Sequence, residues 1–147
     1  MRVISLDFDG VLHPAGDTSS PEDRFKWLPI LERLLKTSQD VRLLIHSSWR
    51  YEYTDQELRD LLGPLNGRFA GSAPRMPRET AIEYVVQGNK GVIKHLLVLD
   101  DEAREFSNGR LELILCGPAT GISALEVQDK IAEWLARTDP SKDTASR

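Results

Sequence analysis

Short apolar runs that end abruptly in polar residues recur three times, and this pattern constrains the fold more than any other feature of the chain. The runs and the residues that follow them are Val3–Leu6 before Asp7 and Asp9, Val41–Ile45 before His46, Ser47 and Ser48, and Leu96–Leu99 before Asp100 and Asp101. Nearly continuous apolar runs of this length are typical of strands that are buried on both faces of a parallel sheet. Ligands bind to such sheets beyond the carboxyl ends of the strands. The polar residues are therefore expected to share one edge of a sheet.

Helical patterns separate the apolar runs. Leucines recur at helical spacing over residues 28–35. Two pairs, Thr54 with Glu57 and Ser123 with Glu126, have the spacing of a capping box at the start of a helix. The alternation of strands with helices predicts an α/β domain with a mostly parallel sheet and right-handed crossovers.

The chain has the size and apolar share of a single domain, with 147 residues of which 40% are hydrophobic. We expect that domain to span residues 1–137, with a loop over His13–Asp23 and a turn at Asn108-Gly109. Residues 138–147 offer almost nothing to bury, which predicts a flexible C-terminal tail. The segments between strands have room for a loop and a helix only, so no large cap domain is expected.

Charge and cysteine content exclude several classes of protein. A net charge of −4 argues against a strongly basic surface that coats nucleic acid, although a local basic patch is compatible with it. The single cysteine, Cys116, rules out an intrachain disulfide and a cysteine-rich zinc site. No window approaches the roughly 20 apolar residues of a membrane-spanning helix, and the first apolar run is too short for a signal peptide. These features predict a soluble, cytoplasmic protein with no membrane contact.

The acids at the strand ends are candidate metal ligands. Asp7 and Asp9 flank one residue, so two carboxylates can reach one side of a hard cation such as Mg²⁺ while Gly10 lets the backbone turn. From the spacing alone, a polar turn whose aspartates cap nearby N–H groups is an equally good interpretation. Asp100 and Asp101 could likewise cap the next helix. Acids at two strand ends and hydroxyls at a third together favour the metal site.

The sequence Asp7-Phe8-Asp9-Gly10-Val11-Leu12 resembles the first motif of the haloacid dehalogenase (HAD) superfamily. Further features resemble, more narrowly, the HAD domain of bacterial Swiss Army Knife RNA-repair proteins: Leu12-His13-Pro14, Ser47-Ser48-Trp49-Arg50, and Arg78 four residues before Ile82. The resemblance runs from Val3 to about Leu135 and implies a three-layer, Rossmann-like HAD fold without a large cap. Ala73 departs from the Thr of that family, so no role is carried over for that hydroxyl.

The resemblance also implies roles for individual residues. Asp7 would be the nucleophile that accepts phosphate, and Asp9 the general acid and base. Ser47 and Arg78 would hold the transferred phosphoryl group, with Lys90, Lys94 and Arg75 as competitors for the part of Arg78. Mg²⁺ would be held by Asp7, the backbone carbonyl of Asp9 and Asp101, the last of these favoured over Asp100. Ser48, Trp49 and Arg50 are weaker candidates for contact with the substrate, because Trp49 is more often a core residue and Arg50 more often a surface ion-pair partner.

Two functions from different classes fit these residues. The first is a magnesium-dependent phosphomonoester hydrolase acting on nucleotide or nucleic-acid terminal phosphates, with Arg50, Arg75, Arg78 and Arg68 around the open edge of the sheet. The second is a non-catalytic module that binds a phosphate or a nucleic-acid end within a repair complex. Expected partners are a phosphorylated small molecule or a nucleic-acid end, together with RNA-repair proteins.

Overall fold

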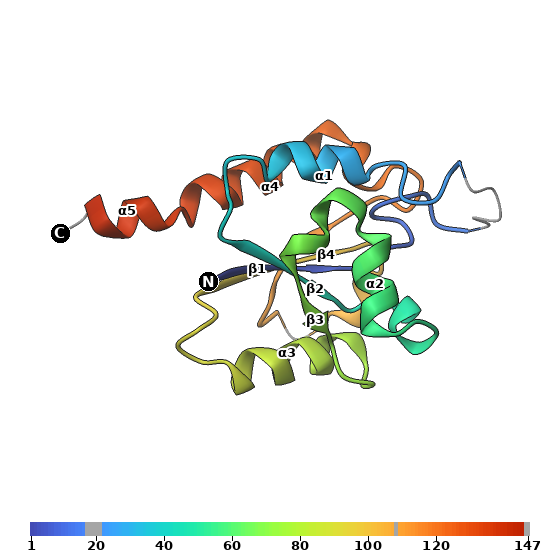
Figure 1. Cartoon of the computed structure of the whole chain (residues 1–147), viewed down its shortest axis with the longest axis horizontal. Helices are drawn as coiled ribbons and strands as arrows, with labels where there is room; N and C mark the ends of the chain where they lie inside the picture. Colours follow the sequence, from blue (N-terminus) through green and yellow to red (C-terminus); the bar gives the residue numbers. More distant parts are fainter. Residues whose placement is uncertain (17–21, 108, 146–147) are drawn as a thin grey trace.

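A computed structural model of the chain describes residues 1–16, 22–107 and 109–145. It contains a five-stranded sheet in which every pair of neighbouring strands is parallel, in the order β3-β2-β1-β4-β5 (Figure 1). The strands are β1 (Arg2–Leu6), β2 (Val41–Ile45), β3 (Phe69–Ser72), β4 (His95–Asp100) and β5 (Glu112–Leu115). The predicted α/β fold with a parallel sheet is confirmed. Part of the expected loop, residues 17–21, and Asn108 of the expected turn lie outside the described residues.

Strand β1 lies at the centre of the sheet, and its register aligns the site. All five of its residues are buried, including the four of the predicted run Val3–Leu6. Leu6, its last residue, is level with Ile45 of β2 and with Leu99 of β4. The residues that follow, Asp7 and His46, continue the ladder through the bonds Asp7 N–H to Leu99 O and His46 N–H to Leu6 O. The polar side chains that follow these three strands therefore lie side by side at one edge of the sheet.

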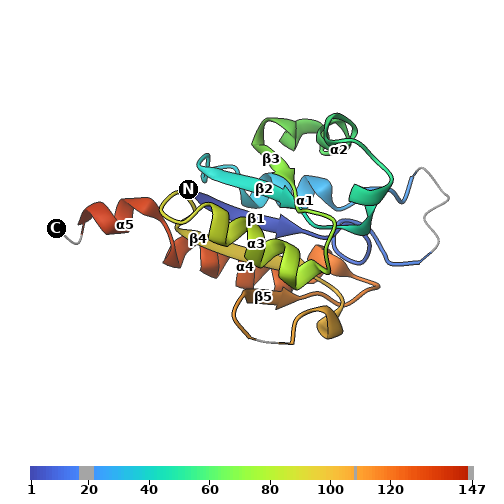
Figure 2. The same cartoon turned by 90° about the horizontal axis from the view of Figure 1, so that it is seen from below.

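Helices cover both faces of the sheet. Helices α1 (Leu28–Leu34) and α4 (Leu125–Arg137) lie on one face, and α3 (Arg78–Gly88) lies on the other (Figures 1 and 2). Helix α2 (Asp55–Leu61) packs beside β3. This is the predicted three-layer arrangement, and the described residues contain no large cap domain. None of the described helices combines the length and the apolar character needed to cross a bilayer.

The two predicted capping boxes have different outcomes. The Thr54–Glu57 box is present at the start of α2, with both reciprocal hydrogen bonds formed. The second prediction is wrong, because α4 begins at Leu125 after Ala124, which provides no side-chain cap. Ser123 instead belongs to a 3₁₀ turn, where its hydroxyl donates to the carbonyl of Thr120. That turn satisfies Ser123 locally, so its hydroxyl does not cap the helix.

The C-terminal segment holds more regular structure than its composition indicated. Thr138 is buried, and its hydroxyl accepts a hydrogen bond from Arg2 while donating to the carbonyl of Trp134. Residues Pro140–Ala145 form a further helix, α5, which projects beyond the sheet (Figure 1). The division of the chain after residue 137 stays a prediction.

Candidate active site

Three carboxylates converge at the carboxyl ends of β1 and β4. Asp7, Asp100 and Asp101 each place one carboxylate oxygen within 4.8 Å of the others. Asp7 and Asp100 are almost completely buried, at 1% and 0% exposure. Burying like charges this close together is unfavourable unless a cation or a proton offsets them. These three residues, called the acidic centre from here on, lie where the resemblance implied a metal site.

Gly10 makes the approach of Asp101 possible. Its φ of 77° lies in the left-handed region that favours glycine. A Cβ on Gly10 would also lie only 2.1 Å from Oδ2 of Asp101. Any side chain at position 10 would displace that carboxylate, so the glycine is needed for packing as well as for the turn.

Arg78 brings a positive charge to the acidic centre. It is the first residue of α3, and its Nη1 donates to Oδ2 of Asp7 at 3.0 Å and to Oδ2 of Asp100 at 2.8 Å. Its competitors lie elsewhere. Lys90 and Lys94 follow the far end of α3, and the guanidinium of Arg75 stands over the ring of Tyr51. The structure thus brings Arg78 together with the predicted nucleophile.

The charges at this centre shift its titration. Burial and the charge of Asp100 raise the pKa of Asp7 to about 8, against the opposing effect of Arg78. Burial also acts to raise the pKa of Asp100, but the hydrogen bond from His46 and the charge of Arg78 outweigh it and lower that pKa. Without a further cation, Asp7 therefore resists ionisation at neutral pH.

His46 hydrogen-bonds Asp100, and no role was predicted for it from the sequence. Its Nε2 lies 2.8 Å from Oδ2 of Asp100, and its Nδ1 lies 2.7 Å from the hydroxyl of Ser5. Burial lowers the pKa of His46 and keeps the imidazole neutral, although Asp100 opposes this shift. These partners assign the proton to Nε2, which donates to Asp100, while Ser5 donates to Nδ1. A serine inside a buried strand and a histidine directly after the next strand were the available signals.

Asp9 points away from the other three acids. Its Oδ1 lies 2.7 Å from Nε2 of His13, and its Oδ2 accepts a hydrogen bond from Nε1 of Trp49 at 3.0 Å. The side chain keeps 38% of its exposure. The carboxylate of Asp9 thus lies outside the acidic cluster, where the aromatic residues around Trp49 orient it.

Ser47 and Trp49 occupy the loop after β2. Ser47 is fully buried, and its hydroxyl accepts a hydrogen bond from the N–H of Trp49, as a cap for the following 3₁₀ turn. Trp49 packs edge-on against Phe8 and Phe25 and stacks on Tyr53. Both residues stabilise the loop that borders the acidic centre.

Arg50 is buried among main-chain carbonyls. Its guanidinium donates to the carbonyls of His46, Ser47, Pro74 and Met76. These bonds connect the loop after β2 with the loop after β3. The donors of Arg50 therefore serve the framework of the site in this conformation.

Comparison with known families decides which group the chain belongs to. The family model for the HAD domain in Swiss Army Knife RNA repair proteins matches residues 3–127. The chain belongs to this HAD family. Comparisons with curated proteins and with solved structures gave no significant match.

The acidic centre of this HAD domain fits the Mg²⁺ ion that HAD proteins generally use. Carboxylate oxygens are the ligands that Mg²⁺ prefers, and Asp7, Asp100 and Asp101 offer three of them at one point. Burial and the charge of Asp100 raise the pKa of Asp7, so positive charge in addition to that of Arg78 would favour its ionised form. A divalent cation would supply that charge.

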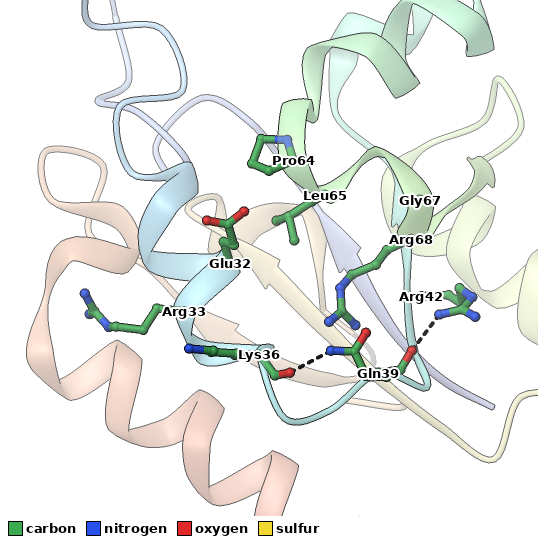
Figure 3. A pocket seen from close by; sticks show the side chains of 9 residues that line it. All are labelled: Glu32, Arg33, Lys36, Gln39, Arg42, Pro64, Leu65, Gly67 and Arg68. Atoms are coloured by element: carbon green, nitrogen blue, oxygen red, sulfur yellow. Dashed lines mark hydrogen bonds between the residues drawn. The ribbon is translucent and has the colours of Figure 1, made fainter.

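A pocket of about 520 Å³ opens beside Arg78 in the HAD domain. Its lining includes Ser48, Tyr51, Arg75, Pro77, Arg78 and Glu105. Ser48 and Tyr51 are exposed there, whereas the guanidinium of Arg50 reaches the pocket from its buried position. The prediction that Arg68 joins this edge is wrong. Arg68 directly precedes β3, so it lies at the opposite end of the sheet (Figure 3).

Proposed function

We propose that this HAD domain hydrolyses phosphomonoesters, with Asp7 as the residue that accepts the phosphoryl group. The observation that carries the proposal is the convergence of Asp7, Asp100 and Asp101 beneath the guanidinium of Arg78. Asp7 and Asp101 would hold Mg²⁺ together with the backbone carbonyl of Asp9. The bound cation supplies positive charge that favours the ionised form of Asp7 and offsets the charge of the phosphate.

The reaction divides into two displacements. In the first, a carboxylate oxygen of Asp7 bonds to phosphorus, the bond from phosphorus to the alcohol oxygen breaks, and Asp9 gives that oxygen a proton. In the second, Asp9 takes a proton from water, whose oxygen bonds to phosphorus and releases Asp7 and inorganic phosphate. Asp9 must turn from His13 toward the leaving oxygen, and its exposed side chain leaves room for that turn.

Arg78 and Ser47 would bind the phosphoryl oxygens. Nη1 of Arg78 already lies at hydrogen-bonding distance from Asp7, so its guanidinium is next to the place where charge develops. Ser47 follows β2 after His46 and borders the same edge, and its hydroxyl keeps its proton for donation because it accepts from the N–H of Trp49. Asp100, fixed by His46, positions Arg78 in turn.

The pocket beside Arg78 supports nucleotide or oligonucleotide ends as substrates. Tyr51 keeps 44% of its exposure there, and the guanidinium of Arg75 stands 5.5 Å from its ring centroid. An exposed aromatic ring bordered by cations suits a nucleobase together with its phosphates. The absence of a large cap from the described residues leaves this edge open to a bulky phosphorylated end.

A panel of phosphorylated compounds tests the proposal. The full chain is incubated with Mg²⁺ and with mononucleotides, oligonucleotides phosphorylated at either end, sugar phosphates and phosphorylated acids, and phosphate release is measured. We expect release that EDTA abolishes, with higher kcat/KM for nucleotide and oligonucleotide ends. A clear preference for a small sugar phosphate would contradict the substrate class. Binding of phosphorylated ends without any release would instead identify the non-catalytic module.

A further inference from the structure

A second charged pocket lies at the opposite end of the sheet. It has a volume of about 690 Å³ and is bordered by the C-terminal end of α1, the start of β2 and the turn before β3. Its charged lining consists of Arg33, Lys36, Arg42 and Arg68, with Glu32 as the one acid among the lining residues; we call it the basic pocket (Figure 3). The length of the five-residue strand β2, about 16 Å, separates it from the acidic centre.

Among the described residues, no acid forms an ion pair with a cation of the basic pocket. Arg68 donates to the carbonyls of Leu35, Ser38 and Val41, and Arg42 donates to the carbonyl of Gln39. No hydrogen bond or ion pair of the Lys36 ammonium group occurs within the part of the chain that the structure describes. Both carboxylate oxygens of the neighbouring Asp40 accept bonds from Arg2 instead.

The like charges also act on one another. Burial and the charge of Arg42 lower the pKa of Arg68. Arg33 lies in the last turn of α1 and Lys36 in the turn that follows the helix, so this end of α1 carries two like charges. An anion in the pocket would relieve this repulsion. A local cluster of four cations also stands out on a chain whose net charge is −4.

The arrangement of the cations selects an extended anion. In Figure 3, Arg33 and Lys36 lie on the side of α1 and Arg68 and Arg42 on the side of β2, with the guanidinium of Arg33 directed toward α4, where it donates to Gln128. Arg33 and Arg42 keep unused N–H donors, because each hydrogen-bonds through a single nitrogen. Guanidinium groups bind phosphate oxygens with two parallel hydrogen bonds. Cations spread along the pocket between α1 and β2 match phosphates that repeat along a chain.

We propose that the basic pocket binds the phosphodiester backbone of a single-stranded RNA segment, at a site separate from the acidic centre. The contacts are ionic and go to the backbone, so binding is independent of base sequence and falls steeply with salt. The pocket would hold an internal stretch of the strand and not its end. The proposal does not depend on phosphatase activity.

Charge reversal at two exposed positions tests the proposal. The probe is a single-stranded RNA of about twelve nucleotides with hydroxyl ends, in EDTA, so that it offers the acidic centre neither a terminal phosphate nor a metal. In fluorescence anisotropy at about 100 mM salt, Arg33→Glu/Lys36→Glu should bind at least about ten-fold more weakly than the unaltered chain. The slope of log K against log salt should become shallower by about 1.4, which is 0.7 for each lost phosphate contact. Lys130→Glu/Lys142→Glu makes the same charge change at exposed residues outside the pocket and should bind normally.

Several outcomes would overturn the proposal. They are the absence of RNA binding by the unaltered chain, an equal loss in both double variants, and equal competition by poly-glutamate. A nucleoside triphosphate that binds as tightly as the oligonucleotide would show a compact-anion site instead. Asp7→Asn should bind the RNA normally, and Arg33→Glu/Lys36→Glu should release phosphate from p-nitrophenyl phosphate at the normal rate. Failure of this proposal can therefore be distinguished from failure of the phosphatase assignment.

Discussion

The two ends of the sheet both carry arginines, but they use them differently. At the carboxyl end, Arg78 and Arg50 are bound by carboxylates and carbonyls within the protein. At the amino end, Arg33 and Lys36 are exposed beside two further cations. The carboxyl end is an ordered site whose three carboxylates suit a cation, whereas the amino end is an exposed surface whose positive charge suits an anion. The same sheet therefore offers one site suited to catalysis and one suited to binding an anion.

The largest effect that would sharpen this comparison is expected for Asp7→Asn. The amide is nearly isosteric but a far poorer nucleophile, so turnover should fall by at least about 10³-fold with the fold intact. Phosphate release and circular dichroism measure the two properties. Near-normal, magnesium-dependent activity of this variant would rule out the covalent mechanism.

Removal of the cation at the carboxyl end should come next. Arg78→Met is expected to lower kcat/KM by about 10²- to 10³-fold, because a preorganised charge beside the phosphoryl group is lost. Arg75→Met removes an equal charge that contacts Tyr51 and not the carboxylates, and we expect a much smaller loss. Equal losses in the two variants would show that general positive charge matters and not the contact with Asp7.

The metal-free protein should lose stability as the pH rises. The folded-state pKa of Asp7 is raised to about 8, so its proton stabilises the folded protein fully below the ordinary carboxyl pKa of 3.8 and progressively less up to pH 8. In EDTA, the free energy of unfolding should fall over this window by a few kcal/mol. The lowered pKa of Asp100 acts in the opposite sense, with stability lost as the pH falls below the ordinary carboxyl pKa. Urea unfolding of the parent and of Asp7→Asn measures the difference, and a parallel pH dependence of the two would contradict it.

A smaller effect is expected for His46→Gln, which keeps a donor for Asp100 but loses the bond to Ser5. Because His46 positions Asp100, the substitution should raise the Mg²⁺ concentration needed for half-maximal rate and lower kcat/KM, each by about ten-fold. The Mg²⁺ concentration at half-maximal rate is the readout that a purely structural role would leave unchanged. Ser5→Ala tests the same chain one step further away and should have a weaker effect.

The smallest effect should come from the amino end. Arg33→Glu/Lys36→Glu is expected to leave kcat/KM for p-nitrophenyl phosphate within about two-fold, because both residues lie beyond the Debye length of about 8 Å from the acidic centre. A large loss of activity would show that the two ends are coupled.

The central strands and the acidic centre were predictable because each is marked by local pattern. The apolar runs fixed β1, β2 and β4, and parallel pairing then had to bring Asp7, Asp100 and Asp101 to one edge. Edge strand β3 carries no such pattern. It has four residues, including a glycine, and is partly exposed, so it lacks a continuous apolar signal.

Partners that depend on tertiary packing were not predictable. Nothing local to Arg50 indicates that it lies among carbonyls from two loops. The prediction that Arg68 lies at the carboxyl edge was wrong because it rested on the charge of the residue and not on its position relative to the strand. It precedes β3, and residues before a parallel strand face the opposite end of the sheet from those after it.

The shared register of the three central strands makes the acidic centre a reporter of sheet integrity. Asp7 and Asp100 meet because Leu6 is level with Leu99, and His46 joins them because Leu6 is level with Ile45. A one-residue slip of any strand would turn these side chains to the other face and send a leucine or isoleucine into the acidic centre. Loss of Mg²⁺ affinity should therefore precede loss of helical signal on mild heating, since ligand alignment tolerates less displacement than helix packing does.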